Sequence, residues 1–167
     1  VDEGVPVIRG ANMGSGRYLD FEDFVFVSDS KVREDLMSNL AYPGDVVFTQ
    51  RGTLGQVTLI PEDSPHERFV VSQSQMKLTV DEGKADKRFL YYYFSSPIGV
   101  ARILNQTSTS GVPHINLSTL RGFTVPCPDV PQQTAIADIL STYDDLIENN
   151  RRRMALLEES ARLLYRE

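Results

Sequence analysis

The chain has 167 residues, of which 41% are hydrophobic and 24% charged, a composition that suits one ordinary domain with an appended element. It contains no run near the ~20 apolar residues of a membrane span, no pattern typical of a signal peptide, and a single cysteine, which excludes an internal disulfide; we expect a cytoplasmic protein that contacts no membrane. The formal net charge of −6 argues against a general nucleic-acid binder, because such proteins usually carry a basic surface.

The charges are unevenly distributed along the chain. Residues 1–49 carry four basic and nine acidic side chains, and residues 129–167 carry five and eight. The middle of the chain, residues 50–128, carries eight basic and six acidic side chains. A surface that faces phosphates is therefore expected to be local and to belong mostly to this middle part.

The first 130 residues alternate short strands with short helices. Runs of β-branched and aromatic residues predict strands over 5–9, 24–27, 45–49, 56–60, 69–80 (with a polar interruption over 72–75) and 123–125. Helices are predicted over 30–40 with Ser28 or Ser30 as the cap, from Asp86 to Tyr93, from Ser96-Pro97 onward, and over 117–121 up to Gly122. Residues 10–16, which include three glycines, and 105–114 are predicted loops.

A long helix is predicted from about Pro131 to the end. Apolar or seam-type residues recur at alternating spacings of four and three, which is the 3.5-residue repeat of a coiled coil, in a helix about 50 Å long. This apolar seam consists of Ile136, Leu140, Tyr143, Ile147, Asn150, Met154, Leu157, Ala161 and Leu164. Such a helix needs a second helix, and a buried Asn150 would fix the register of the pair. The alternative is an amphipathic helix that packs on its own domain.

Six segments, in this order, resemble a known family. They are PVIRGAN (6–12), GDVVFTQRGTLG (44–55), VSQSQ (71–75), HINL (114–117), VPCP (125–128) and QQTAIADIL (132–140). Together they resemble one target-recognition domain and one conserved spacer helix, about half of a type I restriction–modification specificity subunit. The resemblance implies a DNA target-recognition domain over 1–130 and a spacer or dimerisation helix over 131–167.

The resemblance also implies the fold, the function and the partners. The expected fold is α+β, with a mixed, largely antiparallel sheet and short helices followed by a long C-terminal coiled-coil helix. The protein would bind double-stranded DNA without catalysis or cofactor and would direct a methyltransferase subunit, and through it a restriction subunit, to a split DNA site. Because only one unit is present, the partner helix would come from a second copy, which gives a homodimer.

The candidate DNA-binding residues lie mostly on predicted turns. Arginine can contact guanine with two hydrogen bonds and glutamine can contact adenine in the same way. For each turn the alternative is an ordinary solvated loop or an exposed sheet edge. The candidates are Arg9, Asn12, Arg17, Gln50, Arg51, Thr53, Ser72, Gln73, Ser74, Gln75, Lys77, Thr107, Ser108, Ser110 and His114.

Two further clusters have a structural interpretation. Tyr91–Phe94 could stack on bases, but its helical spacing beside Phe89 and Leu90 favours a place in the core. Arg151–Arg153 could contact phosphates, but with acidic neighbours on the same helix it favours a solvated, ion-paired face.

Enzymatic alternatives have little support in the sequence. His66 and His114 have no ligand-spaced partners, so no metal site is expected, and there is no phosphate-binding loop. The best enzymatic candidate is a metal nuclease that uses Asp63, Glu82 and Lys84, although the second and third of these lie in a predicted turn. The other alternative is a protein-interaction adaptor that pairs through its long helix and never contacts DNA.

Overall fold

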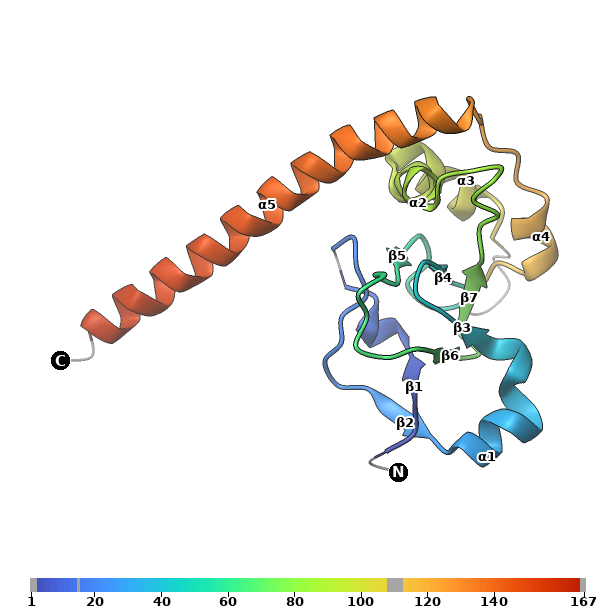
Figure 1. The fold of residues 1–167 in the computed structure, drawn as a ribbon, viewed down its shortest axis with the longest axis horizontal. Coiled ribbons are helices and arrows are strands. Elements are labelled where there is room, and N and C mark those ends of the chain that lie inside the picture. Colours follow the sequence, from blue (N-terminus) through green and yellow to red (C-terminus); the bar gives the residue numbers. More distant parts are fainter. Residues whose placement is uncertain (1–2, 15, 108–112, 166–167) are drawn as a thin grey trace.

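The computed structural model of the chain describes residues 3–14, 16–107 and 113–165. Two small sheets and four short helices form a body, and the helix α5 (Val130–Leu164) leaves it and projects far beyond it (Figure 1). This mixed α and β architecture with a long C-terminal helix confirms the predicted fold class.

The first sheet is built from the N-terminal third of the chain and one later strand. Its order is β2 (Val25–Val27), β1 (Val5–Ile8), β6 (Phe69–Val71) and β3 (Leu40–Ala41). The pair β1–β6 is parallel, and the other pairs are antiparallel. All residues of β1, β6 and β3 are buried, as their apolar composition predicts.

The second sheet has the order β5 (Val57–Leu59), β4 (Val46–Thr49) and β7 (Gln75–Leu78), and both pairs are antiparallel. The region 69–80 is thus two strands in different sheets, and its polar interruption is the turn between them. The strand β4 is buried along its whole length, and its central position explains why it is so rich in valine and phenylalanine.

Short helices connect the sheets where the capping residues predicted them. The predicted helix over 30–40 consists of α1 (Asp29–Lys31), the π-turn η2 (Val32–Leu36) and the 3₁₀ turn η3 (Met37–Asn39), and Leu40 already belongs to β3. Its cap is Ser28, whose side chain accepts a hydrogen bond from Lys31 N.

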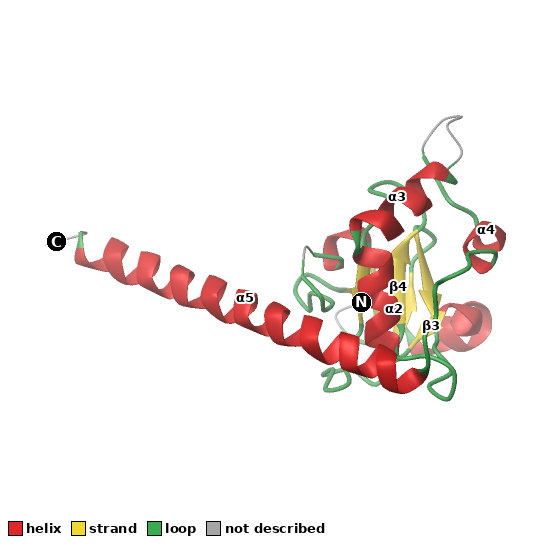
Figure 2. Cartoon of the chain, turned by 90° about the horizontal axis from the view of Figure 1, so that it is seen from above, coloured by secondary structure: helices red, strands yellow, loops and turns green. Residues whose placement is uncertain are grey.

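Two consecutive helices cover the second sheet. They are α2 (Lys87–Ser95), capped by Asp86, and α3 (Pro97–Asn105), capped by Ser96. Figure 2 shows both helices over the strands. The predicted core role of the aromatic run on α2 is confirmed for the two side chains that face the sheet, since Tyr91 and Phe94 are 7% and 4% exposed.

The helix α4 (Leu117–Arg121) follows, capped by Asn116, within the predicted bounds. The strand predicted over 123–125 is wrong, because residues 123–129 are irregular. The carbonyl of Thr124 accepts a hydrogen bond from the Arg102 guanidinium at 2.8 Å. This side-chain hydrogen bond satisfies a backbone group that a neighbouring strand would satisfy in a sheet. Phe123 and Val125 still pack against the core around β4.

The helix α5 begins at Val130 with Asp129 as its cap and Pro131 in its first turn. Its first part packs on α2, where Gln133 and Ala137 are completely buried, and from Asp145 onward its residues are exposed. None of the helices in the described part of the chain is long and apolar enough to cross a membrane.

Asp86 connects α2 to α5 and is expected to matter for stability. Its carboxylate accepts hydrogen bonds from the backbone of Arg88 and Phe89, from the Arg88 guanidinium and from the Thr134 hydroxyl. Burial alone would raise the pKa of Asp86, but the hydrogen bonds, those from Arg88 first, outweigh it and hold this pKa below its ordinary value.

We predict that Asp86→Ala lowers the free energy of unfolding by about 1–2 kcal/mol near neutral pH, because the cap of α2 and its contact with α5 are lost. A carboxyl with a lowered folded-state pKa stabilises the fold above its unfolded pKa, and this contribution disappears as the pH falls through the folded value. The gap between variant and wild type in urea unfolding should therefore shrink as the pH falls below the ordinary aspartate pKa of 3.8 and through the lowered folded value. A pH-independent gap, or an equal loss in the exposed control Asp81→Ala, would contradict this role.

Candidate nucleic-acid interface

Three turns meet at one edge of the second sheet, and backbone hydrogen bonds hold them together. The carbonyl of Ser74 accepts hydrogen bonds from Gln50 N at 2.7 Å and from Arg51 N at 3.2 Å. The carbonyl of Gln50 accepts one from Ile115 N at 3.0 Å, and Arg51 forms an isolated β-bridge with His114. Segments that the sequence separates by more than sixty residues thus form one surface, which we call the three-turn edge (50–53, 72–75 and 113–115).

The side chains of the three-turn edge divide into exposed and supporting ones. Arg51, Thr53 and Gln73 are exposed. Gln75 is only 4% exposed, and its side-chain oxygen accepts a hydrogen bond from the Ser72 hydroxyl. The exposed side chains offer hydrogen bonds to a ligand, whereas the buried glutamine stiffens the turn that carries Gln73.

Half-buried residues complete this edge. Gln50, Ser72, Ser74 and His114 are partly exposed, and each contributes to the contacts that hold the turns together. The amide of Ser72 donates to the carbonyl of Ile8 at 3.1 Å, which connects this edge to the first sheet. The structure therefore brings together the candidates of residues 50–53 and 72–75 with His114.

The early candidates Arg9 and Asn12 have structural partners. Asn12 ends the 3₁₀ turn η1 (Gly10–Asn12) and is 1% exposed. Its side-chain amide donates to the carbonyl of Glu22 at 2.8 Å, and its side-chain oxygen accepts from Arg9 N at 3.1 Å. The Arg9 guanidinium donates to the carbonyl of Asp23 at 2.5 Å. Asn12 is therefore not part of the exposed surface, and residues 10–12 of the predicted loop form the 3₁₀ turn η1.

Arg17 lies apart from the three-turn edge, at the junction with α5. Its guanidinium contacts the Tyr92 hydroxyl at 3.0 Å and the Asp145 carboxylate at 2.6 Å, and its side chain is 10% exposed. Burial lowers the pKa of Arg17, but the hydrogen bond to Tyr92 and the neighbouring groups outweigh it and raise the pKa above its ordinary value. Its position in the sequence gave no sign of this role, because its partners are 75 and 128 residues away.

The remaining DNA-binding candidates are Lys77, Thr107, Ser108 and Ser110. Lys77 Nζ is 3.6 Å from Asp45 Oδ2 and 5.6 Å from the centre of the Tyr42 ring. The Thr107 hydroxyl donates to the carbonyl of Leu104 at 2.7 Å. Ser108 and Ser110 lie outside the described residues.

A groove of about 700 Å³ adjoins the three-turn edge and shares Gln50 and Gln75 with it. Its lining includes the aromatic rings of Phe48 and Phe94 and two cations, Lys77 and Arg121, with no carboxylate among the lining residues. Arg121 is exposed at the end of α4 and was not among the predicted site residues. A lone arginine in a short helix gave no signal, since only the fold brings it to the groove that Lys77 also lines.

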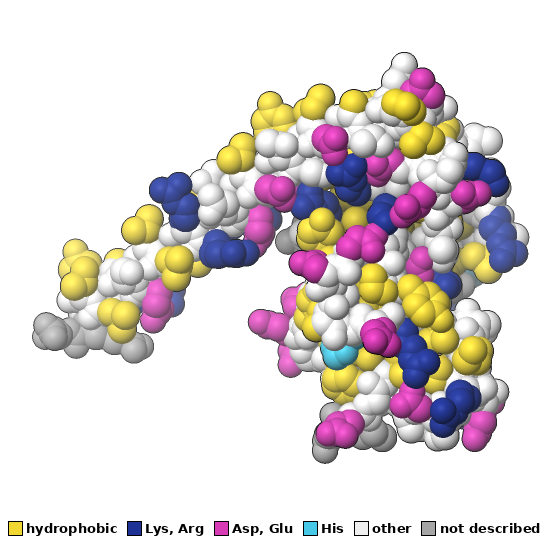
Figure 3. Space-filling model, viewed as in Figure 1, with side chains coloured by type: hydrophobic (Ala, Val, Ile, Leu, Met, Phe, Trp, Pro, Cys, Tyr) yellow, Lys and Arg dark blue, Asp and Glu magenta, His cyan; other side chains and the backbone are white. Residues whose placement is uncertain are grey.

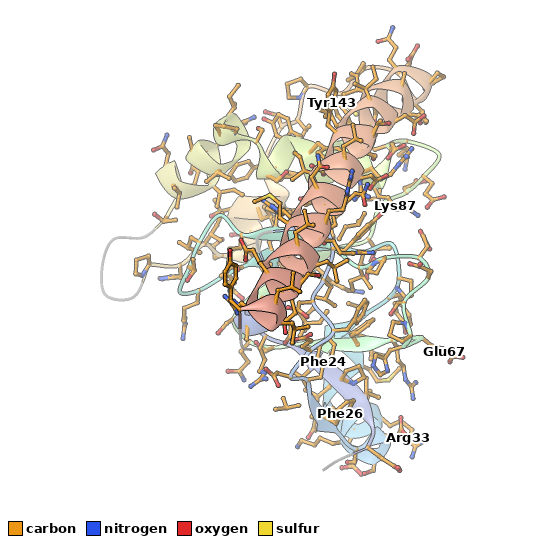
Figure 4. All side chains as sticks on the ribbon, turned by 90° about the vertical axis from the view of Figure 1, so that its left-hand side faces the viewer. Phe24, Phe26, Arg33, Glu67, Lys87 and Tyr143 are labelled. Carbon is orange, nitrogen blue, oxygen red and sulfur yellow. The ribbon has the colours of Figure 1, made fainter. Side chains whose placement is uncertain are left out.

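The nuclease candidates are engaged elsewhere. Glu82 pairs with Lys87 at 2.5 Å, Lys84 pairs with Asp81 at 2.8 Å, and Asp63 lies in a turn. Lys87, the ion-pair partner of Glu82, is labelled in Figure 4. It lies away from the first sheet and its surroundings, where the labels mark Phe24, Phe26, Arg33 and Glu67. Among the described residues, no group of three or more His, Cys, Asp or Glu side chains could hold a metal ion.

The apolar seam of α5 is exposed along its whole length. Exposed fractions rise from 41% and 38% at Ile136 and Leu140 to 69% and 80% at Leu157 and Leu164, and Asn150 is exposed as well. Figure 3 shows hydrophobic side chains along the edge of α5 that points away from the body. The helix packs on the body with another face, formed by Gln133, Ala137, Ser141 and Asp144.

The sequence matches proteins of one family. The family model described as type I restriction modification DNA specificity domain matches residues 4–159. The chain is 27% identical over 123 residues to the type I restriction enzyme MjaIX specificity subunit of Methanocaldococcus jannaschii, covering 74% of this chain and 27% of that protein. It is 27% identical over 125 residues to the EcoBI specificity subunit of Escherichia coli, covering 75% of this chain and 24% of that protein.

Solved structures share the fold. A chain from a study of complex assembly and conformational transition of the type I R-M system has a TM-score of 0.62 and 16% identity, over 97% of this chain and 36% of that one. The HsdS subunit from Thermoanaerobacter tengcongensis has a TM-score of 0.56 and 17% identity, over 75% of this chain and 32% of that one. The chain thus spans about a quarter of the curated relatives and about a third of these solved chains.

Two glycines in the turn that carries Arg51 and Thr53 allow a matched test of how the turn is held. Both have a positive φ, +94° at Gly52 and +88° at Gly55. A Cβ on Gly52 would meet nothing within 4 Å, whereas one on Gly55 would lie 2.8 Å from the Val100 side chain on α3.

We predict that Gly52→Ala costs about 1–2 kcal/mol of unfolding free energy from backbone strain alone. Gly55→Ala should cost about 1–3 kcal/mol more, because the new methyl group collides with a stiff β-branched side chain. Urea unfolding of the two variants measures the difference. Equal losses would show that α3 does not support this turn.

Proposed function

Because this chain belongs to the family of type I restriction modification DNA specificity domains, we propose that its three-turn edge recognises a short DNA sequence and that the chain itself performs no catalysis. The observation that carries the proposal is the convergence of the three turns through the Ser74 and Gln50 carbonyls. This convergence gathers side chains for base recognition on one exposed edge.

The chemistry of the exposed side chains suits the major groove of DNA. The Arg51 guanidinium can donate two hydrogen bonds to guanine, and the Gln73 amide can donate to and accept from adenine. Thr53 offers a hydroxyl group for hydrogen bonding and a methyl group for contact with thymine. Gly52 beside them has nothing within 4 Å of its missing Cβ, so a ligand can approach the backbone closely.

The charge distribution suggests how such a protein would gain affinity. Each cation that neutralises a phosphate releases counterions, and a net charge of −6 leaves few cations for this purpose. Lys77, whose ammonium lies 3.6 Å from Asp45 Oδ2, and Arg121 both line the groove beside the three-turn edge. We infer that this region supplies the phosphate contacts and that partner subunits supply the remaining affinity.

The partners follow from the family and from the exposed helix. We propose that the chain acts in the cytoplasm as half of a specificity subunit, which directs a methyltransferase subunit, and through it a restriction subunit, to a split DNA site. Residues 1–130 would form the recognition domain, and 131–167 the spacer helix. Because the apolar seam is uncovered, a second copy of α5 would pair with it and give a homodimer with two recognition edges.

Selection from random duplex DNA tests the proposed function. The chain, alone and together with its cognate methyltransferase subunit, should enrich DNA that contains a short half-site. Failure to enrich any sequence in the presence of the methyltransferase would contradict DNA recognition and would favour an adaptor that pairs only through its helix.

We predict that Arg51→Ala weakens binding to the selected half-site by about 1–3 kcal/mol and relaxes one base position, because a two-hydrogen-bond contact is lost. Fluorescence anisotropy with the selected site and its single-base variants measures both effects. Arg33→Ala is the control, since Arg33 (labelled in Figure 4) is exposed on η2 and belongs neither to the three-turn edge nor to the lining of the groove beside it. An unchanged binding profile for Arg51→Ala would remove the 50–53 turn from the interface.

We also predict that the chain forms dimers and that Leu157→Asp raises their dissociation constant at least tenfold. The substitution places a charge in the apolar seam, which the dimer would bury. Sedimentation equilibrium measures the dissociation constant. Leu156→Asp is the matched control, because Leu156 is similarly exposed, at 63%, but lies off the seam. A wild-type monomer at high micromolar concentration would contradict pairing, as would an equal effect of the two variants.

A further inference from the structure

We propose that Arg17 is a positioning residue that sets the angle between α5 and the recognition domain. Where the proposed function holds, this angle determines the distance between the two recognition edges of a dimer, and therefore the spacing of the two DNA half-sites. The proposal rests on how α5 is attached to the body, and on the place of Arg17 within that attachment.

The start of α5 is anchored by a buried glutamine. Gln133 is completely buried; its side-chain oxygen accepts from Asp86 N at 2.9 Å, and its amide donates to the carbonyl of Pro128 at 2.7 Å. One turn later, the Asp138 carboxylate accepts from the Arg88 guanidinium at 2.7 Å. These contacts fix the position of the first turns, around which the rest of the helix could tilt.

Arg17 contacts the helix at the far end of this attachment. Its guanidinium donates to Asp145 Oδ1 at 2.6 Å and to the Tyr92 hydroxyl at 3.0 Å. The Tyr92 hydroxyl in turn donates to Asp144 Oδ2 at 2.8 Å. Burial raises the pKa of Tyr92, so this hydroxyl stays protonated and continues to donate. One arginine thus joins a loop of the first third of the chain to α2 and α5 at once.

Outside the cluster of Arg17, Tyr92, Asp144 and Asp145, the contacts of α5 do little to restrain its tilt. Ala137 is the one buried apolar residue among the described residues of α5, so apolar packing contributes little to the attachment. Beyond Asp145, no described residue of α5 forms a hydrogen bond or an ion pair with the body. A cleft of about 770 Å³ opens there between α5 and the loop that carries Arg17 and Tyr18.

The distances along the helix make the Arg17 contact effective. At 1.5 Å per residue, Asp145 lies about 18 Å from Gln133 and the tip at Leu164 about 45 Å from it. A tilt of about 10° would therefore move the tip by about 8 Å, which is more than two base pairs of DNA. A contact about 18 Å from the pivot resists this tilt better than Arg88, which lies about 8 Å from it.

The geometry also explains why an arginine is suited to this position. Its planar group can donate in two directions at the same time, here to a phenol and to a carboxylate, whereas a lysine presents a single point charge. The guanidinium lies 4.4 Å from the centre of the Tyr18 ring, which supports it from one side. Lysine at this position would keep the positive charge but would lose the planar group that donates to Tyr92 and Asp145 at the same time.

The first test measures the angle without DNA. Spin labels at Met37→Cys and Glu158→Cys, in a Cys127→Ser background and diluted with unlabelled chain, report the distance from the body to α5 by pulsed electron resonance. We expect one narrow distance for the wild type, a distribution broadened by about 6 Å for a 10° tilt in Arg17→Gln, and an intermediate width for Arg17→Lys. Asp145→Asn should broaden the distribution too, and because Asp145 is 68% exposed its loss should not affect folding.

Arg68→Gln is the matched control, since Arg68 forms a comparable ion pair with Asp29 at 2.5 Å, far from α5. It should leave the distribution unchanged. Distributions as narrow as that of the wild type in both Arg17→Gln and Asp145→Asn would overturn the proposal, whatever the melting temperatures of the variants.

The second test uses DNA with two selected half-sites at varied spacing. The wild type should prefer one spacing, and Arg17→Gln should accept a wider range while each half-site alone binds as before. An unchanged spacing preference would overturn the link between Arg17 and spacing. If the wild type selects no DNA at all, the proposed function fails, and the distance measurement still decides whether Arg17 sets the angle.

Discussion

The chain passes from one sheet to the other between Val71 and Gln75, and the geometry of this crossing determines where the candidate site lies. β6 belongs to the first sheet and β7 to the second, so the turn between them connects the end of one sheet's strand to the start of the other's. There the carbonyl of Ser74 faces the end of β4 and accepts hydrogen bonds from Gln50 and Arg51. The crossing thus supports the turn after β4, and that turn bonds in its own right to the segment around His114.

A second constraint governs the long helix, which has two faces with different chemistry. The face toward the body carries Gln133, Ala137, Ser141 and Asp144, which form hydrogen bonds and bury little apolar surface. Hydrogen bonds and ion pairs of this kind are directional but contribute modest free energy, so they define an angle more than they add stability. The apolar seam is exposed and is left for a partner, and of its residues Ile147 also lines the cleft between α5 and the body. The helix can therefore hold a fixed pose on its own domain and still pair with another helix.

Local sequence patterns predicted the local structure well. The caps Asp86 and Ser96 and the proline at the start of α5 marked three of the helices, because capping depends on residues that are close in sequence. The strand predicted over 123–125 failed because Arg102, more than twenty residues away, satisfies the backbone there. Asn12 and Arg17 were grouped with the DNA-binding candidates because both lie in a polar, glycine-rich loop. Their roles depend on partners that only the folded chain brings near, such as Tyr92 and Asp145 for Arg17.

The central claim is that DNA contacts the three-turn edge while the junction of α5 with the body stays free of DNA. Hydrogen–deuterium exchange of the chain, with and without its selected DNA, tests this most directly. We expect slower exchange on DNA binding at residues 50–53 and 73–74 and around His114, and unchanged exchange around Tyr18 and along residues 141–148. Protection of the α5 junction with no change at the three turns would contradict the account.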